Sequence, residues 1–131
     1  MLDHHDGAPV NSWFHARSSA NRWGGTPEEY IEIHEWIDGS KASLGDARHR
    51  ALRHHTEGVW TCQRIFGRVL KLSTGREVAV REVAERHIIE DLGGLPTFAD
   101  YLAETPLASW MGGAKKRTVS LESINLKENP A

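Results

Sequence analysis

The chain has 131 residues, 26% of them charged, and a formal net charge of −2, which suits one globular domain and argues against binding nucleic acid by bulk electrostatics. No apolar run approaches membrane-spanning length and no signal-peptide pattern opens the chain, so we expect a cytoplasmic protein without a membrane partner. A single cysteine, Cys62, excludes an internal disulfide framework, whereas eight histidines are many for this length.

Polar residues dominate both ends of the chain. We expect residues 1–11 to form a disordered leader, residues 12–111 a single His-rich helical domain, and residues 112–131 a disordered tail. Two tryptophans between Ser12 and Gly25 predict a short arm or helix that packs onto the domain. His15 is the residue with the most obvious chemistry in that segment.

The stretch Thr26-Pro27-Glu28-Glu29 predicts the start of a helix. Thr26 can cap it, Pro27 suits the first helical position, and Glu29 completes a capping box. This helix is expected to continue to Ile37, with His34 on its apolar face and Asp38 at its end.

The segment from Leu44 to Phe66 has the spacing of one long amphipathic helix. It carries three histidines, His49, His54 and His55. At about 100° per residue, His55 falls within the apolar stripe and His54 a quarter-turn to its side, while His49 points toward the charged back. We therefore expect His55 to be the more deeply buried and His49 to matter less.

Alternating apolar residues predict a β-hairpin after this helix. Its strands are expected around Leu70–Leu72 and Val78–Val80, with a turn at Ser73-Thr74-Gly75. A short helix is expected from Ala84 to Leu92, followed by a helical turn capped by Thr97. The predicted fold is mostly α (α+β), with three to four helices around a long central helix and one β-hairpin.

Two His–Asp pairs share a spacing of four residues, which places both side chains of each pair on one face of a helix. They are His34 with Asp38 and His87 with Asp91. Together with the histidines of the segment 44–66, they predict that three helices converge on a site for a divalent transition metal. Nitrogen and carboxylate ligands without thiolate suit zinc, iron, manganese or nickel. The candidate metal ligands are His34, His54, His55, His87 and His49, with His34, His55 and His87 expected to cluster in space.

If the protein is an enzyme, metal-assisted hydrolysis fits these residues best. Asp38, Asp91 or Glu57 would then act as the catalytic base. The alternative is a non-enzymatic interaction or regulatory module whose histidines are structural, because a four-spaced His–Asp pair is often only a surface contact. The partner is a small molecule or a protein in either case, and its identity, like the oligomeric state, stays open.

A set of short motifs follows one another in a fixed order along the chain. The motifs are Ile33-His34-Glu35-Trp36 with Asp38, Ser40-Lys41-Ala42, Arg48-His49-Arg50-Ala51, His54-His55, Glu57-Gly58, Phe66-Gly67, Val80-Arg81, Glu85, His87, Glu90-Asp91-Leu92-Gly93 and Leu95-Pro96-Thr97. This set resembles an uncharacterised family of small His-rich bacterial and phage proteins, domain of unknown function family 6915. The resemblance spans about His15 to Met111 and implies a single domain with a His-rich core, without implying a reaction. Two departures are Phe14, where the family pattern has a second histidine, and Gly39, where it has another residue. A looser, fold-level analogy links His34, His54-His55 and Asp91 to helical phosphohydrolases with scattered histidines and a final aspartate.

Overall fold

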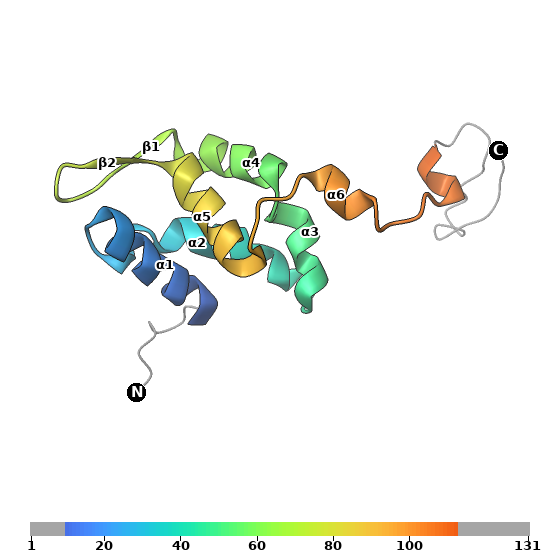
Figure 1. Cartoon of the computed structure of the whole chain (residues 1–131), viewed down its shortest axis with the longest axis horizontal. Helices are drawn as coiled ribbons and strands as arrows, with labels where there is room; N and C mark the ends of the chain where they lie inside the picture. Colours follow the sequence, from blue (N-terminus) through green and yellow to red (C-terminus); the bar gives the residue numbers. More distant parts are fainter. Residues whose placement is uncertain (1–9, 113–131) are drawn as a thin grey trace. The chain divides into compact units, whose positions relative to one another are not determined.

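The computed structural model describes residues 10–112, and in this range the chain is mostly helical with one two-stranded antiparallel hairpin, as predicted (Figure 1). The chain divides after Tyr101 into two units. The first holds the helical domain, and the described part of the second holds a 3-10 turn, Ser109–Gly112. The predicted leader and tail lie almost wholly outside the described residues. No helix in the described range is long and apolar enough to cross a membrane.

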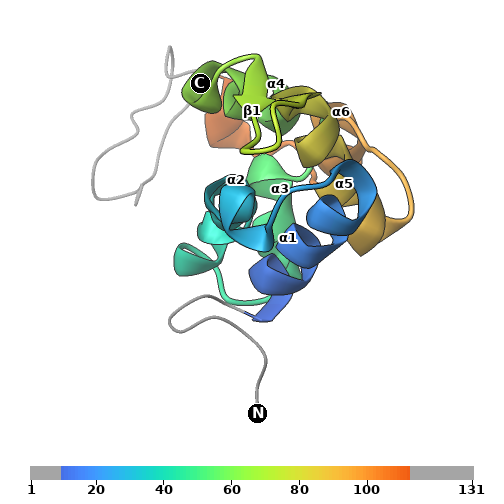
Figure 2. The same ribbon diagram turned by 90° about the vertical axis from the view of Figure 1, so that its left-hand side faces the viewer.

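Helix α5 packs against three other helices, α1, α2 and α4; Figure 2 shows it beside α1. It buries Val80, Val83, Ala84, His87 and Ile88, which recur at the spacing of one helical face. A histidine therefore belongs to the most deeply buried stripe of the domain. The elements in chain order are α1 (Val10–Trp23), α2 (Ile31–Asp38), α3 (Arg50–Arg53), α4 (Thr56–Phe66), β1 (Val69–Lys71), β2 (Glu77–Ala79), α5 (Val80–Leu92) and α6 (Phe98–Leu102).

The prediction of one continuous helix from Leu44 to Phe66 is wrong, because the helix breaks between α3 and α4. His55 adopts an extended backbone, with φ −163° and ψ 177°, and its Nδ1 accepts a hydrogen bond from the backbone N–H of Gly58 at 3.0 Å. It is thus the N-cap of a new helix rather than a residue within an old one. Gly58 permits the sharp restart, because a Cβ there would lie 2.0 Å from the carbonyl oxygen of Arg53.

The predicted capping box is confirmed, although it opens a 3-10 turn, Pro27–Glu29, that leads into α2. The backbone N–H of Thr26 donates to Glu29 Oε2 at 3.0 Å. The other oxygen of Glu29 accepts from the backbone N–H of Ser73 at 2.7 Å. One carboxylate therefore caps the approach to α2 and also holds the turn of the hairpin.

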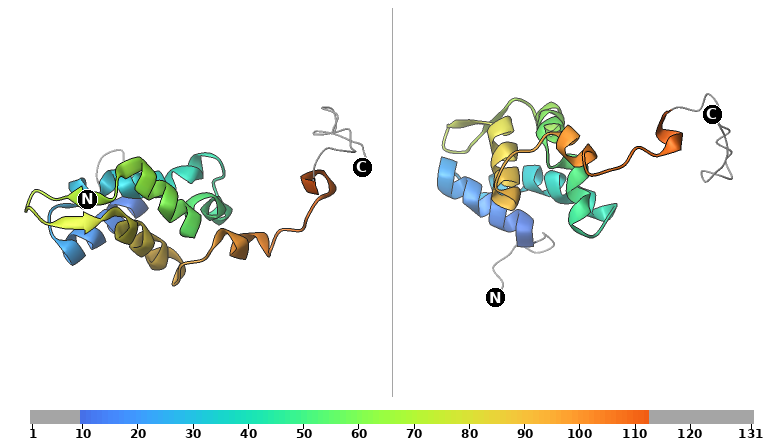
Figure 3. Two further views of the ribbon diagram at one scale, coloured as in Figure 1. Left: turned by 90° about the horizontal axis from the view of Figure 1, so that it is seen from above. Right: turned by 45° about the vertical axis from the view of Figure 1, so that its right-hand side comes forward.

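The hairpin is confirmed too, with Leu70 opposite Val78 in antiparallel register. It ends earlier than predicted, because Val80 already belongs to α5 and its side chain joins the buried stripe of that helix. The hairpin extends at the end of the first unit where α1 finishes, and Arg76 Nη1 there donates to the carbonyl oxygen of Trp23 at 3.0 Å (Figure 3).

Candidate metal centre

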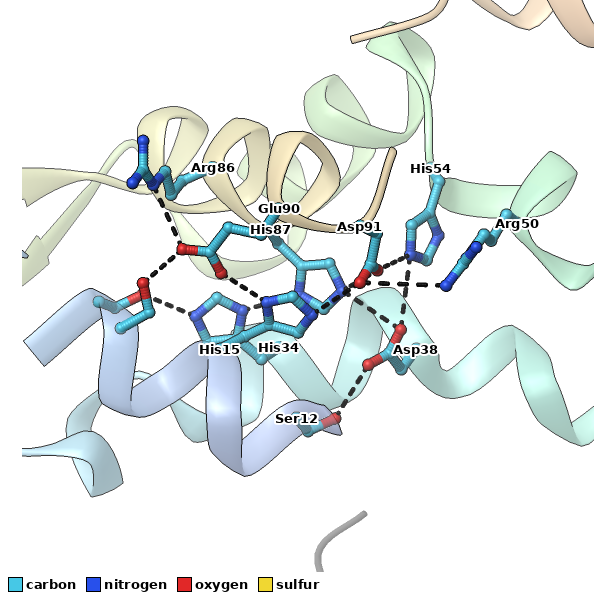
Figure 4. Close-up of polar contacts among 12 residues, drawn as sticks. Ser12, His15, His34, Asp38, Arg50, His54, Arg86, His87, Glu90 and Asp91 are labelled. Carbon is cyan, nitrogen blue, oxygen red and sulfur yellow. Dashed lines mark hydrogen bonds and ion pairs between the residues drawn. The ribbon is translucent and has the colours of Figure 1, made fainter. Parts of the chain in front are cut away.

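Four side chains from three parts of the chain meet in the interior, and their ligand atoms all lie within 4.8 Å of one another. They are Asp38 at the end of α2, His54 at the break between α3 and α4, and His87 and Asp91 on α5. Figure 4 shows the four side chains pointing toward one another. Both histidines are fully buried, Asp38 is 4% exposed, and the Asp91 side chain is 11% exposed.

Each of the two imidazoles faces both carboxylates through Nε2. His54 Nε2 lies 3.5 Å from Asp38 Oδ1 and 3.1 Å from Asp91 Oδ2. His87 Nε2 lies 3.2 Å from Asp38 Oδ1 and 3.3 Å from Asp91 Oδ2. Four bonds of about 2.0–2.1 Å in tetrahedral directions would place neighbouring ligand atoms about 3.3–3.5 Å apart. These four nitrogen–oxygen distances match four of the six edges expected around a tetrahedral divalent ion, and the remaining nitrogen–nitrogen and oxygen–oxygen separations lie within 4.8 Å.

Each carboxylate is held through one oxygen by helix α1 and offers the other oxygen to the cluster. Ser12 Oγ donates to Asp38 Oδ2 at 3.2 Å, which leaves Oδ1 facing the histidines. His15 Nε2 contacts Asp91 Oδ1 at 3.0 Å, which leaves Oδ2 facing them. Such outer contacts orient metal ligands and are a regular part of metal sites.

His15 bridges two carboxylates and is the cationic member of this outer shell. Its Nδ1 lies 2.6 Å from Glu90 Oε1, and its ring stacks on that of His87 with centroids 3.8 Å apart. Burial disfavours the charged imidazole, but the hydrogen bonds and charges of Asp91 and Glu90 outweigh it and raise the pKa of His15 to about 9. His15 is therefore protonated at neutral pH and donates to both carboxylates.

A buried chain of hydrogen bonds leads away from His87. Its Nδ1 lies 2.8 Å from His34 Nδ1, and His34 Nε2 lies 2.8 Å from Ser19 Oγ. Burial, followed by the proximity of His87, lowers the pKa of His34 well below its usual value, so this ring is neutral. If His87 Nε2 binds a metal, its Nδ1–H donates to His34, which in turn donates from Nε2 to Ser19. This network can accommodate the tautomer of His87 that a metal ligand requires, with the ring proton on Nδ1.

Without a metal, the cluster holds its charges as histidine–carboxylate pairs. Burial disfavours ionisation of Asp38 and Asp91, yet hydrogen bonds to the histidines outweigh it, so the pKa of each carboxyl lies below its usual range. Burial by itself would lower the pKa of His54, but the hydrogen bonds to Asp38 and Asp91 outweigh this effect and raise that pKa. A metal on His54 Nε2 would displace this proton, so binding should be coupled to proton release.

The remaining predicted site residues lie outside this group of four. His34 contacts the group through His87, and both of its ring nitrogens are hydrogen-bonded. The expected cluster of His34, His55 and His87 is thus only partly right, because His55 turns back toward α3, where its Nε2 bonds to the carbonyl oxygen of Ala51 at 3.0 Å. Glu57 has a side chain 66% exposed at the start of α4 and accepts from Thr56 Oγ1 at 3.1 Å.

The expectation that His49 faces the solvent side is wrong, since it is 3% exposed. Its Nδ1 lies 2.8 Å from Ser40 Oγ, and its ring meets the edge of His54 with centroids 5.4 Å apart. The reason is the same break in the helix: His49 belongs to the 3-10 turn Ala47–His49, whose axis differs from that of α4.

The prediction from the sequence assigned no site residue to α1, although this helix carries the side chains that orient the cluster. Ser12, His15 and Ser19 are all at most 3% exposed, at the spacing of one helical face. A stripe of small polar residues with one histidine, where a core helix would carry leucine or isoleucine, is the signal that identifies such a face.

A family model described as domain of unknown function DUF6915 matches residues 10–111. The chain belongs to this family. The match covers the described domain from the first residue of α1, including every residue of the candidate metal cluster and the α1 side chains that contact it. Neither the curated proteins nor the solved structures contain a significant match to the chain.

Proposed function

We propose that this domain binds one divalent transition-metal ion through Asp38, His54, His87 and Asp91. The observation that carries the proposal is that two imidazole nitrogens and two carboxylate oxygens from separate elements lie at ligand-to-ligand spacing in the interior. Two carboxylates also balance the charge of a divalent ion, which removes the main cost of burying it.

Zinc fits the four donors best among the metals that the residue types allow. Histidine nitrogen and carboxylate oxygen are both regular zinc ligands, and zinc needs no sulfur donor beside them. Iron, manganese and nickel accept the same donors but prefer further ligands, which water could supply beside the partly exposed Asp91. The ion would join α2, the break between α3 and α4, and α5, so its binding free energy would also stabilise the fold.

Metal-assisted hydrolysis is a second candidate, favoured by one observation on the same side of the cluster. Arg50 Nη2 lies 4.0 Å from Asp91 Oδ1, and the Arg50 side chain is 28% exposed. A cation between solvent and a metal site can stabilise negative charge that develops on a substrate. For hydrolysis the ion would need a fifth ligand position, or one carboxylate would have to leave it, so that a bound water could be activated; Arg50 would orient the substrate.

The test of metal binding is a titration of the chelator-treated full chain with zinc, followed by calorimetry. We expect one ion per chain, and Asp38→Asn or His87→Ala should weaken binding more than the about 10–100-fold that loss of an outer-shell contact costs. Glu57→Gln is the matched control, because Glu57 is exposed and lies outside the cluster. Equal zinc affinity in the wild type, His87→Ala and Glu57→Gln would refute the proposal.

A further inference from the structure

Among the residues that the structure describes, two buried side-chain polar atoms have no hydrogen-bond partner, and both lie beside the metal cluster. They are Arg50 Nε and His54 Nδ1. Arg50 opens α3 and His54 follows as its C-cap, four residues later, so both project from one side of the same helical turn. Both also approach Asp91, through Arg50 Nη2 and His54 Nε2. Unpaired buried groups are rare in proteins and call for a bound water, ion or ligand.

The metal determines what kind of ligand would satisfy these two atoms. If His54 Nε2 binds the ion, the proton of the neutral imidazole must sit on Nδ1. Arg50 Nε carries a hydrogen in every state. Both atoms are then donors, so the missing partner has to be an acceptor, and oxygen is the acceptor that both prefer.

The charge of Arg50 adds a second requirement for this ligand, which is that it should be anionic. The guanidinium of Arg50 lies near Asp91, but at 4.0 Å it makes no direct hydrogen bond to it. A metal ion bound to Asp91 would neutralise the negative charge of that carboxylate. Arg50 would then have a partly exposed guanidinium whose nearest counter-charge is shared with a divalent cation. An anionic oxygen would supply the missing negative charge beside the Arg50 guanidinium. A guanidinium binds two oxygens of a phosphate through two of its N–H groups at once.

We propose that a phosphate-type oxyanion binds beside the metal, held by Arg50 and by the Nδ1–H of His54. This inference rests on the proposed metal site and narrows its substrate class to phosphate and phosphate monoesters. The oxyanion and the metal are coupled: each raises the affinity of the other by the same factor, because a coupling free energy between two sites is reciprocal.

The experiment measures inorganic phosphate binding by calorimetry to the full chain, with and without one equivalent of zinc, after zinc affinity has been determined in phosphate-free buffer. We expect phosphate to bind at least about 10-fold more tightly to the zinc-loaded protein, as a coupling of typical size produces. Glycerol phosphate in the same assay distinguishes a monoester from free phosphate, since an open site accepts both and a closed one accepts only phosphate.

Arg50→Gln should weaken phosphate binding about 10–100-fold, as loss of a hydrogen bond to a charged group does, while zinc affinity without phosphate stays within about 3-fold of the wild type. Arg50→Lys should recover part of the loss, because it keeps the charge but not the planar fork. Arg48→Gln is the matched control, since Arg48 is 77% exposed and pairs with Asp46.

Zinc binding without phosphate binding would refute this inference alone and leave the metal site intact; a water molecule would then satisfy the two atoms. Equal phosphate affinity in Arg50→Gln and Arg48→Gln would refute it as well. A chain that binds no zinc would refute both proposals.

Discussion

Replacement of Gly58 by alanine tests whether the sharp restart of α4 positions the metal cluster. A Cβ at this position would lie 2.0 Å from the carbonyl oxygen of Arg53, 2.7 Å from its carbonyl carbon and 3.0 Å from its Cα. All three are backbone atoms of the preceding helix, so no side-chain rotation relieves the contact. Helix α4 would have to move away from α3, and His54 and His55 lie at the break between them.

The expected cost follows from two opposing effects. Alanine in place of glycine in a helix gains about 1 kcal/mol of intrinsic propensity. Overpacking of a well-packed interior costs about 1–3 kcal/mol, and a contact with backbone belongs at or above the upper end of that range. The clash therefore wins, and Gly58→Ala should lower the free energy of unfolding by about 2 kcal/mol. For a domain of this size the melting temperature should fall by about 10 °C.

Chemical denaturation and zinc titration of the same variants provide the assay. Gly45→Ala is the matched control, because a Cβ at Gly45 meets nothing within 4 Å and its backbone has no positive φ. It should be neutral or slightly stabilising. Gly58→Ala should also weaken zinc binding, since His54 moves with the displaced helix start. Wild-type stability and zinc affinity in Gly58→Ala would show that this close approach does not hold the site.

His55→Ala should lower the free energy of unfolding by about 1–2 kcal/mol through loss of an N-cap, while zinc still binds. His54→Ala should abolish zinc binding. Loss of zinc binding in both variants would contradict this division of roles between the two neighbours. Cys62 should resist alkylation in the folded protein, because burial raises the pKa of its thiol to about 12, and mass spectrometry should find modification only after denaturation. In metal-free protein the free energy of unfolding should fall as pH rises from 6.5 through about 9, because the folded state keeps a proton on His15 that the unfolded state has lost. His15→Gln should flatten that part of the denaturation profile, and an unchanged profile would show that another group is responsible.

Several structural features of this protein depend on interactions between residues close together in the sequence. The capping box at Thr26 and the hairpin around Ser73 depend on residues a few positions apart, so spacing alone predicts them. The helix expected from Ala84 to Leu92 is present too, but it begins earlier, at Val80. The residues of the candidate metal cluster were all among the predicted site residues, His54 and His87 as metal ligands and Asp38 and Asp91 as catalytic bases. Spacing of four along α5 places His87 and Asp91 on one face wherever that helix packs.

Only the tertiary structure decided which histidines meet. Helical periodicity predicts the directions of side chains around one continuous helix axis. The helix breaks at His54 and His55, so the imidazole rings of these adjacent residues turn to different neighbours. Likewise, nothing local specifies that Ser12 reaches Asp38 or that His15 reaches Asp91, contacts that span 26 and 76 residues of chain. Such contacts depend on how α1 packs against α2 and α5, and this packing is chosen by the burial of whole helix faces rather than by any short stretch of sequence.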